Sequence, residues 1–176
     1  MENEHCFHAY IGDGKGKTTC CVGLALRHAG QNGRVLFTQF LKSNTSGELK
    51  PLAGIDNITV FLGKPTPKFI FAMTADELAA EKAAQNEYFD AIDRTAVQEH
   101  PTMIICDELF SAVETGLIDA ARAQEYIERW LKGAEVVATG RNAPENLLAL
   151  ADYVTQMRKI KHPFDRGLPA RRGVEF

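Results

Sequence analysis

Gly12-Asp13-Gly14-Lys15-Gly16-Lys17-Thr18-Thr19 lies between a short apolar run, Cys6 to Ile11, and an amphipathic segment that ends near Ala29. Glycines let such a loop curl until successive backbone N–H groups point at anionic oxygens. The start of the following helix adds its positive dipole end. Lys17 is then placed to contact a bridging or terminal phosphate, and the Thr18 hydroxyl to bind magnesium. Residues 12–19 therefore predict a site for the phosphates of a nucleotide.

The loop departs from the common phosphate-loop pattern at its start. That pattern has a glycine five residues before Gly16, where this sequence has Ile11, and the first glycine, Gly12, comes one place later. Lys15 is an additional cation that the pattern does not require, and it is either a phosphate contact or a solvated surface lysine. The alternative to phosphate binding is a glycine-rich turn that serves packing alone.

A second candidate element is the apolar run Met103 to Cys106, which ends in Asp107 and Glu108. A continuous apolar run is typical of a strand buried on both faces. Carboxylates that leave such a strand need a cation or hydrogen bonds to compensate them. We predict that Asp107, Glu108 or both hold the metal of a bound nucleotide together with Thr18; a helix-capping acid is the alternative. Arg141 follows another predicted strand and is either a phosphate contact or half of a structural ion pair.

Strand-like and helix-like segments alternate along the chain. Apolar runs predict strands at 6–11, 35–41, 58–62, 103–106, 135–139 and 154–160. Helical periodicity follows at 18–29, after a capping box formed by Thr74 and Glu77, at 119–131 and after Pro144. This alternation favours an α/β fold with a mostly parallel sheet and helices on both faces. We expect a single domain over residues 1–176, with ligands bound beyond the carboxyl ends of the strands.

The composition excludes several classes of protein. The chain has 176 residues, 45% of them hydrophobic and 24% charged, as in ordinary globular domains. Its formal net charge of -3 argues against nucleic acid and anionic membrane as partners. No apolar run approaches the roughly 18 residues of a membrane span, and the N-terminus does not resemble a secretory signal. The 4 cysteines form no CxxC pair, so we expect reduced thiols in a cytoplasmic protein.

The loop and the acidic pair occur with four further segments in a fixed order. These are Gln39-Phe40-Leu41-Lys42, Thr139-Gly140-Arg141, Leu150-Ala151-Asp152 and the C-terminal Lys161-His162-Pro163-Phe164-Asp165-Arg166-Gly167. Together with Asp107-Glu108-Leu109, the series resembles the ATP:corrinoid adenosyltransferases of the cobalamin-synthesis type. The resemblance extends over nearly the whole chain, from about Phe7 to Phe176. Its C-terminal part is the most specific, since ordinary P-loop proteins lack it.

The resemblance implies an enzyme that transfers the 5′-deoxyadenosyl group of ATP to the Co(I) of a corrinoid, either cobalamin or cob(I)yrinic acid a,c-diamide. Triphosphate would be released, in adenosylcobalamin synthesis or salvage. It further implies a three-layer, RecA-like P-loop fold, a homodimer, Mg²⁺ or Mn²⁺ with the ATP, and a reduced flavoprotein as electron donor. Lys17 and the loop would stabilise the departing charge. Cobalt needs no deprotonation, so Glu108 would serve the metal rather than activate water.

The resemblance also assigns roles on the corrinoid side. Family members bind the nucleotide in the reverse sense to most P-loop proteins, which presents its 5′ carbon to the corrin. Phe69 and Phe71 stand where the family has a Phe-x-Trp segment that forms an apolar wall under the cobalt; the alternative is two core aromatics. His162 is not expected to ligate cobalt, because a lower histidine ligand would oppose the four-coordinate route. Few residues precede Phe7, which predicts that the N-terminal lid of many members is absent.

Two other classes stay open on the sequence alone, because a phosphate loop and an acidic pair describe many proteins. One is a small ATPase or nucleotide-dependent switch with the conventional nucleotide orientation. The other is a non-catalytic sensor of ATP or a corrinoid. ATP is preferred over GTP in every case, since the guanine-specific Asn-Lys-x-Asp motif does not occur.

Overall fold

The computed structural model describes residues 5–175 and contains a six-stranded sheet in which all neighbouring strands are parallel. The sheet order is β3-β2-β4-β5-β1-β6. The strands are β1 (Phe7–Ile11), β2 (Val35–Gln39), β3 (Ile58–Leu62), β4 (Met103–Asp107), β5 (Glu135–Thr139) and β6 (Tyr153–Gln156). The helices are α1 (Lys17–Ala29), α2 (Leu49–Ala53), α3 (Ala75–Glu99), α4 (Leu109–Glu114), α5 (Ala120–Trp130) and α6 (Glu145–Leu150), with 3-10 turns at Ile70–Ala72 and Pro163–Arg166. The predicted α/β fold is confirmed.

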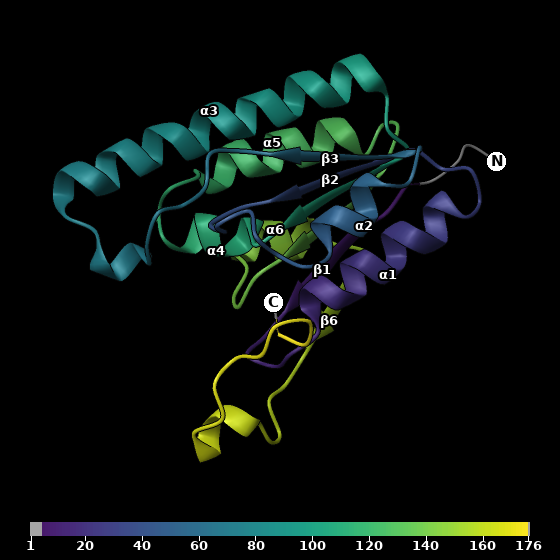
Figure 1. The fold of residues 1–176 in the computed structure, drawn as a ribbon. Helices are drawn as coiled ribbons and strands as arrows, with labels where there is room; N and C mark the ends of the chain where they lie inside the picture. Colours follow the sequence, from purple (N-terminus) through teal and green to yellow (C-terminus); the bar gives the residue numbers. More distant parts are fainter. Residues whose placement is uncertain (1–4, 176) are drawn as a thin grey trace.

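Helices cover both faces of the sheet, with α3 and α5 above it and α1 and α2 below it in Figure 1. Two hydrophobic clusters fill the spaces between these layers. Successive side chains of β2 point to opposite faces of the sheet and so enter different clusters. Leu36 packs in the cluster under α3, while Val35 and Phe37 pack in the cluster against α1. The inner strands β2, β4 and β5 are therefore largely apolar on both faces, which explains their continuous hydrophobic runs, whereas the edge strand β6 is exposed.

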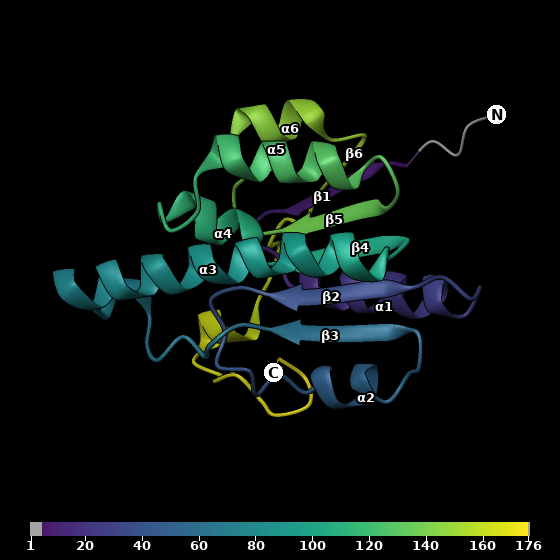
Figure 2. The same cartoon turned by 90° about the horizontal axis from the view of Figure 1, so that it is seen from above.

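The carboxyl ends of the strands meet along one edge of the sheet, where the arrowheads point in Figure 2. The loop 12–19 follows β1, Gln39 ends β2, Asp107 ends β4 and Thr139 ends β5. Gln39 pairs with Asp107 in the register of the two neighbouring strands. The phosphate loop and the motifs that begin at Gln39, Asp107 and Thr139 therefore lie at the same edge of the sheet.

Several boundaries differ from the sequence prediction. The second strand ends at Gln39 rather than Leu41, which has a left-handed φ of 55°. The last strand ends at Gln156 rather than Ile160, because the carbonyl of the next residue, Met157, accepts the Gly14 N–H of the phosphate loop. The helices α2 and α4 were not predicted, since 5 and 6 residues are too few to show a helical period.

The long helix α3 begins as predicted. Thr74 accepts the Glu77 N–H, and the Glu77 carboxylate accepts the Thr74 N–H, so the capping box is confirmed. The first part of α3 extends past the ends of the strands in Figure 2. Within residues 5–175, none of the helices combines the length and the apolar character that a membrane crossing needs.

Candidate nucleotide site

The phosphate loop forms a closed curl at the start of α1. Gly16 occupies the N-cap position with φ 117°, a left-handed conformation that glycine adopts without strain. The Lys17 ammonium turns back over the loop and donates to the carbonyl oxygens of Gly12 at 2.7 Å and Gly14 at 2.9 Å. The first hydrogen bond of the helix runs from Cys20 N to Gly16 O. Helix formation therefore leaves the N–H groups of residues 17–19 available to an anion.

The first half of the loop is held by the chain itself. Gly12 N donates to Arg141 O at 2.8 Å, and Gly14 N donates to Met157 O at 2.7 Å. A Cβ at Gly12 would lie 2.3 Å from the Met157 oxygen, and one at Gly14 would lie 2.7 Å from it. Both glycines are therefore required by the close approach of another backbone. Asp13 accepts the Lys159 N–H at 3.0 Å, and this hydrogen bond lowers the pKa of the Asp13 carboxyl.

Asp107 lies fully buried at the end of β4. Its carboxylate accepts hydrogen bonds from the Thr18 hydroxyl at 3.0 and 3.1 Å and from the Thr139 hydroxyl at 2.8 Å. Lys42 Nζ lies 2.5 Å from the same carboxylate, and Gln39 Nε2 donates to it at 3.3 Å. A buried charge is tolerated only when it is paired in this way. The structure thus brings Thr18 and Asp107, two of the predicted metal ligands, into direct contact.

Glu108 is oriented differently from its neighbour. It precedes α4 with φ 63°, and its N–H donates to the Thr139 hydroxyl at 2.8 Å. Its carboxylate accepts the Ser111 hydroxyl at 2.5 Å, so the acid lies at the N-cap position of α4 without capping the helix backbone. Asp107 is therefore the member of the acidic pair that contacts the phosphate-loop helix.

The two other cations of the prediction lie at the margin of this arrangement. The Arg141 side chain is exposed. The backbone of this residue contacts the phosphate loop, where its carbonyl oxygen accepts the Gly12 N–H. Lys15 is also exposed. It lies close enough to Glu175 to contribute to the low pKa of that carboxyl, about 2, for which the hydrogen bond from Arg171 is the main cause.

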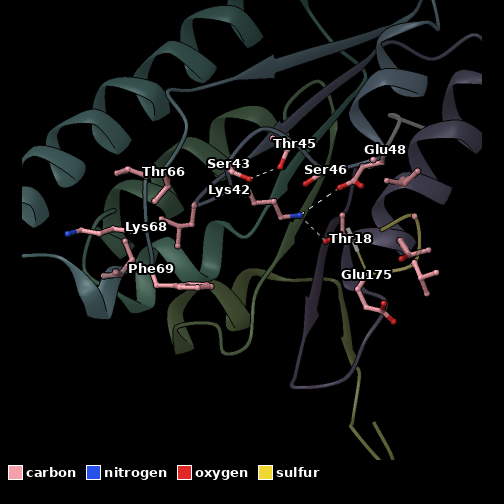
Figure 3. Close-up of a pocket in the computed structure, with 18 residues that line it drawn as sticks. Thr18, Lys42, Ser43, Thr45, Ser46, Glu48, Thr66, Lys68, Phe69 and Glu175 are labelled. Carbon is pink, nitrogen blue, oxygen red and sulfur yellow. Dashed lines mark hydrogen bonds and ion pairs between the residues drawn. The ribbon is translucent and has the colours of Figure 1, made fainter. Parts of the chain in front are cut away.

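A cavity of about 950 Å³ opens beside the phosphate loop (Figure 3). This volume lies in the range of small-molecule and cofactor sites. Thr18, Thr19 and Val22 of α1 form one wall, and the segment from Leu41 to Glu48 forms another. Residues 66–70 and the C-terminal residues 173–175 complete the lining.

Phe69 precedes the 3-10 turn before α3, and Phe71 lies within this turn. Phe69 lines the cavity, and its ring stacks on that of Phe71 with centroids 5.3 Å apart and an interplanar angle of 9°. The two residues are 75% and 88% exposed, which excludes the alternative that they belong to the core. Exposed, stacked aromatic side chains are typical of a surface that contacts an apolar ligand or partner.

Three members of the hydrogen-bond network around Asp107 were not predicted as site residues. Gln39 and Lys42 entered the sequence analysis only as part of a family motif, and Thr139 only as part of Thr139-Gly140-Arg141. A usable signal existed, since polar residues at the ends of neighbouring buried strands must meet at one edge. Met157, whose carbonyl contacts the loop, gives no such signal because any residue type supplies a carbonyl.

A glycine loop with its lysine, a hydroxyl at the helix start and a buried acid on the adjoining strand end define a P-loop nucleotide-binding protein. Comparison with known families narrows this class, because the model described as ATP:corrinoid adenosyltransferase BtuR/CobO/CobP matches residues 3–176. The chain belongs to the ATP:corrinoid adenosyltransferase family. It is therefore an enzyme of cobalamin synthesis with ATP and a corrinoid as substrates, and adenosyl transfer is favoured over the ATPase and sensor alternatives.

Individual relatives agree with the family match. A corrinoid adenosyltransferase of Sinorhizobium sp is 32% identical over 170 residues, which cover 94% of this chain and 77% of the relative. The corrinoid adenosyltransferase of Escherichia coli K12 is 28% identical over 95% of this chain and 83% of its own length. The corrinoid adenosyltransferase CobA of Salmonella typhimurium LT2 has the same identity and coverage.

Proposed function

We propose that residues 12–19 hold the triphosphate of ATP while the ribose 5′ carbon faces the cavity, where Co(I) of the corrinoid attacks it. The electron pair of Co(I) forms the cobalt–carbon bond, and the bond from the 5′ carbon to oxygen breaks as triphosphate leaves. The observation that carries this proposal is the contact between Thr18 and the buried Asp107 on one side of a cavity that Phe69 lines on another.

In this proposal, Lys17 and the backbone of α1 stabilise the leaving group. The Lys17 ammonium now donates to two loop carbonyls, so it must exchange these contacts for phosphate oxygens when ATP binds. Interactions that strengthen as charge develops lower the barrier to transfer. Since cobalt is the nucleophile and carries no proton, no side chain is needed as a general base.

The site also fits a divalent cation, Mg²⁺ or Mn²⁺. Thr18 and Asp107 present a hydroxyl and a carboxylate at one point, which are ligands that Mg²⁺ prefers, and Glu108 is the adjacent acid. In the described part of the chain, no group of three or more His, Cys, Asp or Glu side chains could hold a metal by itself. We propose that phosphate oxygens complete the coordination. When bound, the cation would neutralise charge on the triphosphate.

Phe69 and Phe71 would receive the corrinoid. Their stacked rings are exposed and provide an apolar surface. A corrinoid bound against this surface would have no polar group there to coordinate its cobalt. An apolar wall of this kind favours loss of the lower axial ligand, which makes Co(I) easier to reach. Phe71 takes the place of the family's tryptophan, so this wall has a smaller second ring.

We further propose a homodimer of one-domain subunits over residues 1–176, with a reduced flavoprotein as electron donor, in the cytoplasm. The two core clusters on one sheet support the single domain. Cys21 and Cys106 are free thiols, as expected in a reducing compartment. Burial raises the pKa of both, that of Cys106 to about 12, so they stay protonated and unreactive.

Product analysis tests the proposed reaction. The protein is incubated without oxygen with ATP, cob(I)alamin and Mg²⁺, and the Lys17→Ala variant serves as the matched control. We expect a light-sensitive cobalt–carbon product together with an equal amount of triphosphate. ADP and phosphate alone would indicate an ATPase instead, and binding of both ligands without any product would indicate a sensor.

A further inference from the structure

Lys42 places a positive charge at the point where the phosphate-loop helix, β4 and α2 converge. Its Nζ lies 2.5 Å from Asp107 Oδ2, 3.4 Å from Thr18 Oγ1 and 3.8 Å from Glu48 Oε1. Figure 3 shows the ammonium reaching between Glu48 and Thr18. The side chain is 22% exposed and lines the cavity, whereas the Asp107 carboxylate is fully buried. The ammonium thus closes the cavity side of the buried acid.

Gln39 links the two carboxylates that surround the Lys42 ammonium. Its amide nitrogen donates to Glu48 Oε1 at 2.8 Å and to Asp107 Oδ2 at 3.3 Å. Two carboxylate acceptors fix the NH₂ group on that side, because an amide oxygen there would face like charges. The Gln39 carbonyl oxygen is then left buried without a hydrogen-bond partner among residues 5–175, in a side chain that is 3% exposed. This oxygen lies on the side of the amide away from the two carboxylates, so the cation position beside Asp107 is defined by Lys42 and Thr18 rather than by Gln39.

Lys42 occupies the position beside Asp107 that a divalent cation would take, so the two cations compete for one place. Asp107 and Glu48 contribute two negative charges, and Lys42 compensates one of them. A divalent ion placed beside Thr18 and Asp107 would meet the ammonium within a few ångströms, which is strongly repulsive at low dielectric. The residue before Lys42, Leu41, has φ 55°, which is uncommon for a bulky side chain and marks a constrained backbone.

We propose that Lys42 is a resident cation, which holds the divalent-metal position of the nucleotide-free enzyme and is exchanged when ATP and metal bind together. This inference rests on the proposed use of a divalent cation with ATP. The triphosphate brings the negative charge that lets the metal displace the ammonium from Asp107. The freed Lys42 side chain stays on the wall of the cavity beside the start of α1, where it faces the phosphates. Until then the site discriminates against metal alone.

Mn²⁺ binding to the nucleotide-free protein tests whether Lys42 holds the metal position; the loss of the free-ion signal in electron paramagnetic resonance measures this binding. We expect Lys42→Met to bind Mn²⁺ at least about tenfold more tightly than the wild type, since the competing charge is gone. Lys42→Arg, which keeps the charge, should bind as weakly as the wild type. Lys68→Met is the matched control, because that lysine also lines the cavity but pairs with Glu77.

A double variant locates the ion. Adding Asp107→Asn to Lys42→Met should abolish the gain in Mn²⁺ affinity, whereas unchanged tight binding in the double variant would overturn the proposal. Equal Mn²⁺ affinity of Lys42→Met and wild type would overturn it as well. If Lys42→Met does not fold, Lys42→Gln gives the same comparison with a neutral donor to Asp107. No adenosyl transfer is measured, so a failure of the proposed reaction would appear separately.

Discussion

The phosphate end and the aromatic end of the cavity are built in opposite ways. At the phosphate end, Asp107 is fully buried and accepts hydrogen bonds from two threonines, a glutamine and a lysine. At the aromatic end, Phe69 and Phe71 contact each other in the open, and the first turns of α3 behind them are exposed as well. In the proposed triphosphate site the buried acid is thus already held by hydrogen bonds, although Lys17 and Lys42 must change partners when ATP binds, whereas the proposed corrinoid surface is exposed. Preorganised charge is what stabilises a departing triphosphate.

The largest effect that sharpens this contrast is expected at the phosphate end. Lys17→Ala should lower ATP affinity or turnover by about tenfold or more, taking a charge-assisted phosphate contact as worth about 1.5–3 kcal/mol. Calorimetric ATP titration and the anaerobic transfer assay measure the two quantities. Lys82→Ala, which removes an exposed lysine from α3, is the control. A Lys17→Ala variant with wild-type affinity and rate would contradict the placement of the phosphate loop.

The aromatic end should show a separate and smaller effect. Replacing both Phe69 and Phe71 by alanine should slow adenosyl transfer by about tenfold, since stacking and apolar contact with the corrin are lost. ATP affinity and the free energy of unfolding should not change, because both rings are exposed in the absence of ligand. Parallel measurement of transfer rate, ATP affinity and urea unfolding separates these outcomes. If ATP affinity fell by as much as the transfer rate, the two ends of the cavity would not act separately, which would contradict this account.

The smallest effect concerns the anchor of the aromatic turn. Thr74→Ala removes the cap of α3 and should lower the free energy of unfolding by about 1 kcal/mol. Urea denaturation at neutral pH measures this change. Transfer should be affected less than in the double phenylalanine variant, because the aromatic rings remain. An unchanged free energy of unfolding would show that the capping box contributes nothing to the folded protein.

The same anchor should respond to pH. A hydrogen bond from Lys68, followed by that from the Thr74 N–H, lowers the pKa of Glu77 from 4.5 to about 2. Since the folded pKa lies below the unfolded one, this contribution to stability is complete above about pH 4.5 and disappears toward pH 2. Thermal unfolding of wild type and Glu77→Gln should therefore converge as the pH falls through this window. A difference that stays constant would contradict the pairing of Lys68 with Glu77.

Local signals in the sequence were enough for much of the fold. The apolar run before Asp107 predicted a buried central strand, and Thr74 with Glu77 predicted the start of α3 within one residue. These features depend on neighbours in the chain. The phosphate loop was also recognisable, because Gly16, Lys17 and Thr18 are adjacent in sequence.

The parts that could not be predicted depend on distant contacts. The carbonyl of Met157 binds Gly14 across 143 positions, and no residue type announces such a contact. Lys42 reaches Asp107 only because β2 and β4 are neighbours in the sheet, an order that the sequence does not state. The choice of Asp107 over Glu108 as the contact of Thr18 likewise depends on how β4 turns into α4.

A crystal structure with ATP and Mg²⁺ bound tests the central claim most directly. The triphosphate should lie within the curl of residues 12–19, and the ribose 5′ carbon should be open to the cavity on the side of Phe69. The opposite orientation, with the terminal phosphorus facing the cavity and the 5′ carbon enclosed by protein, would contradict it.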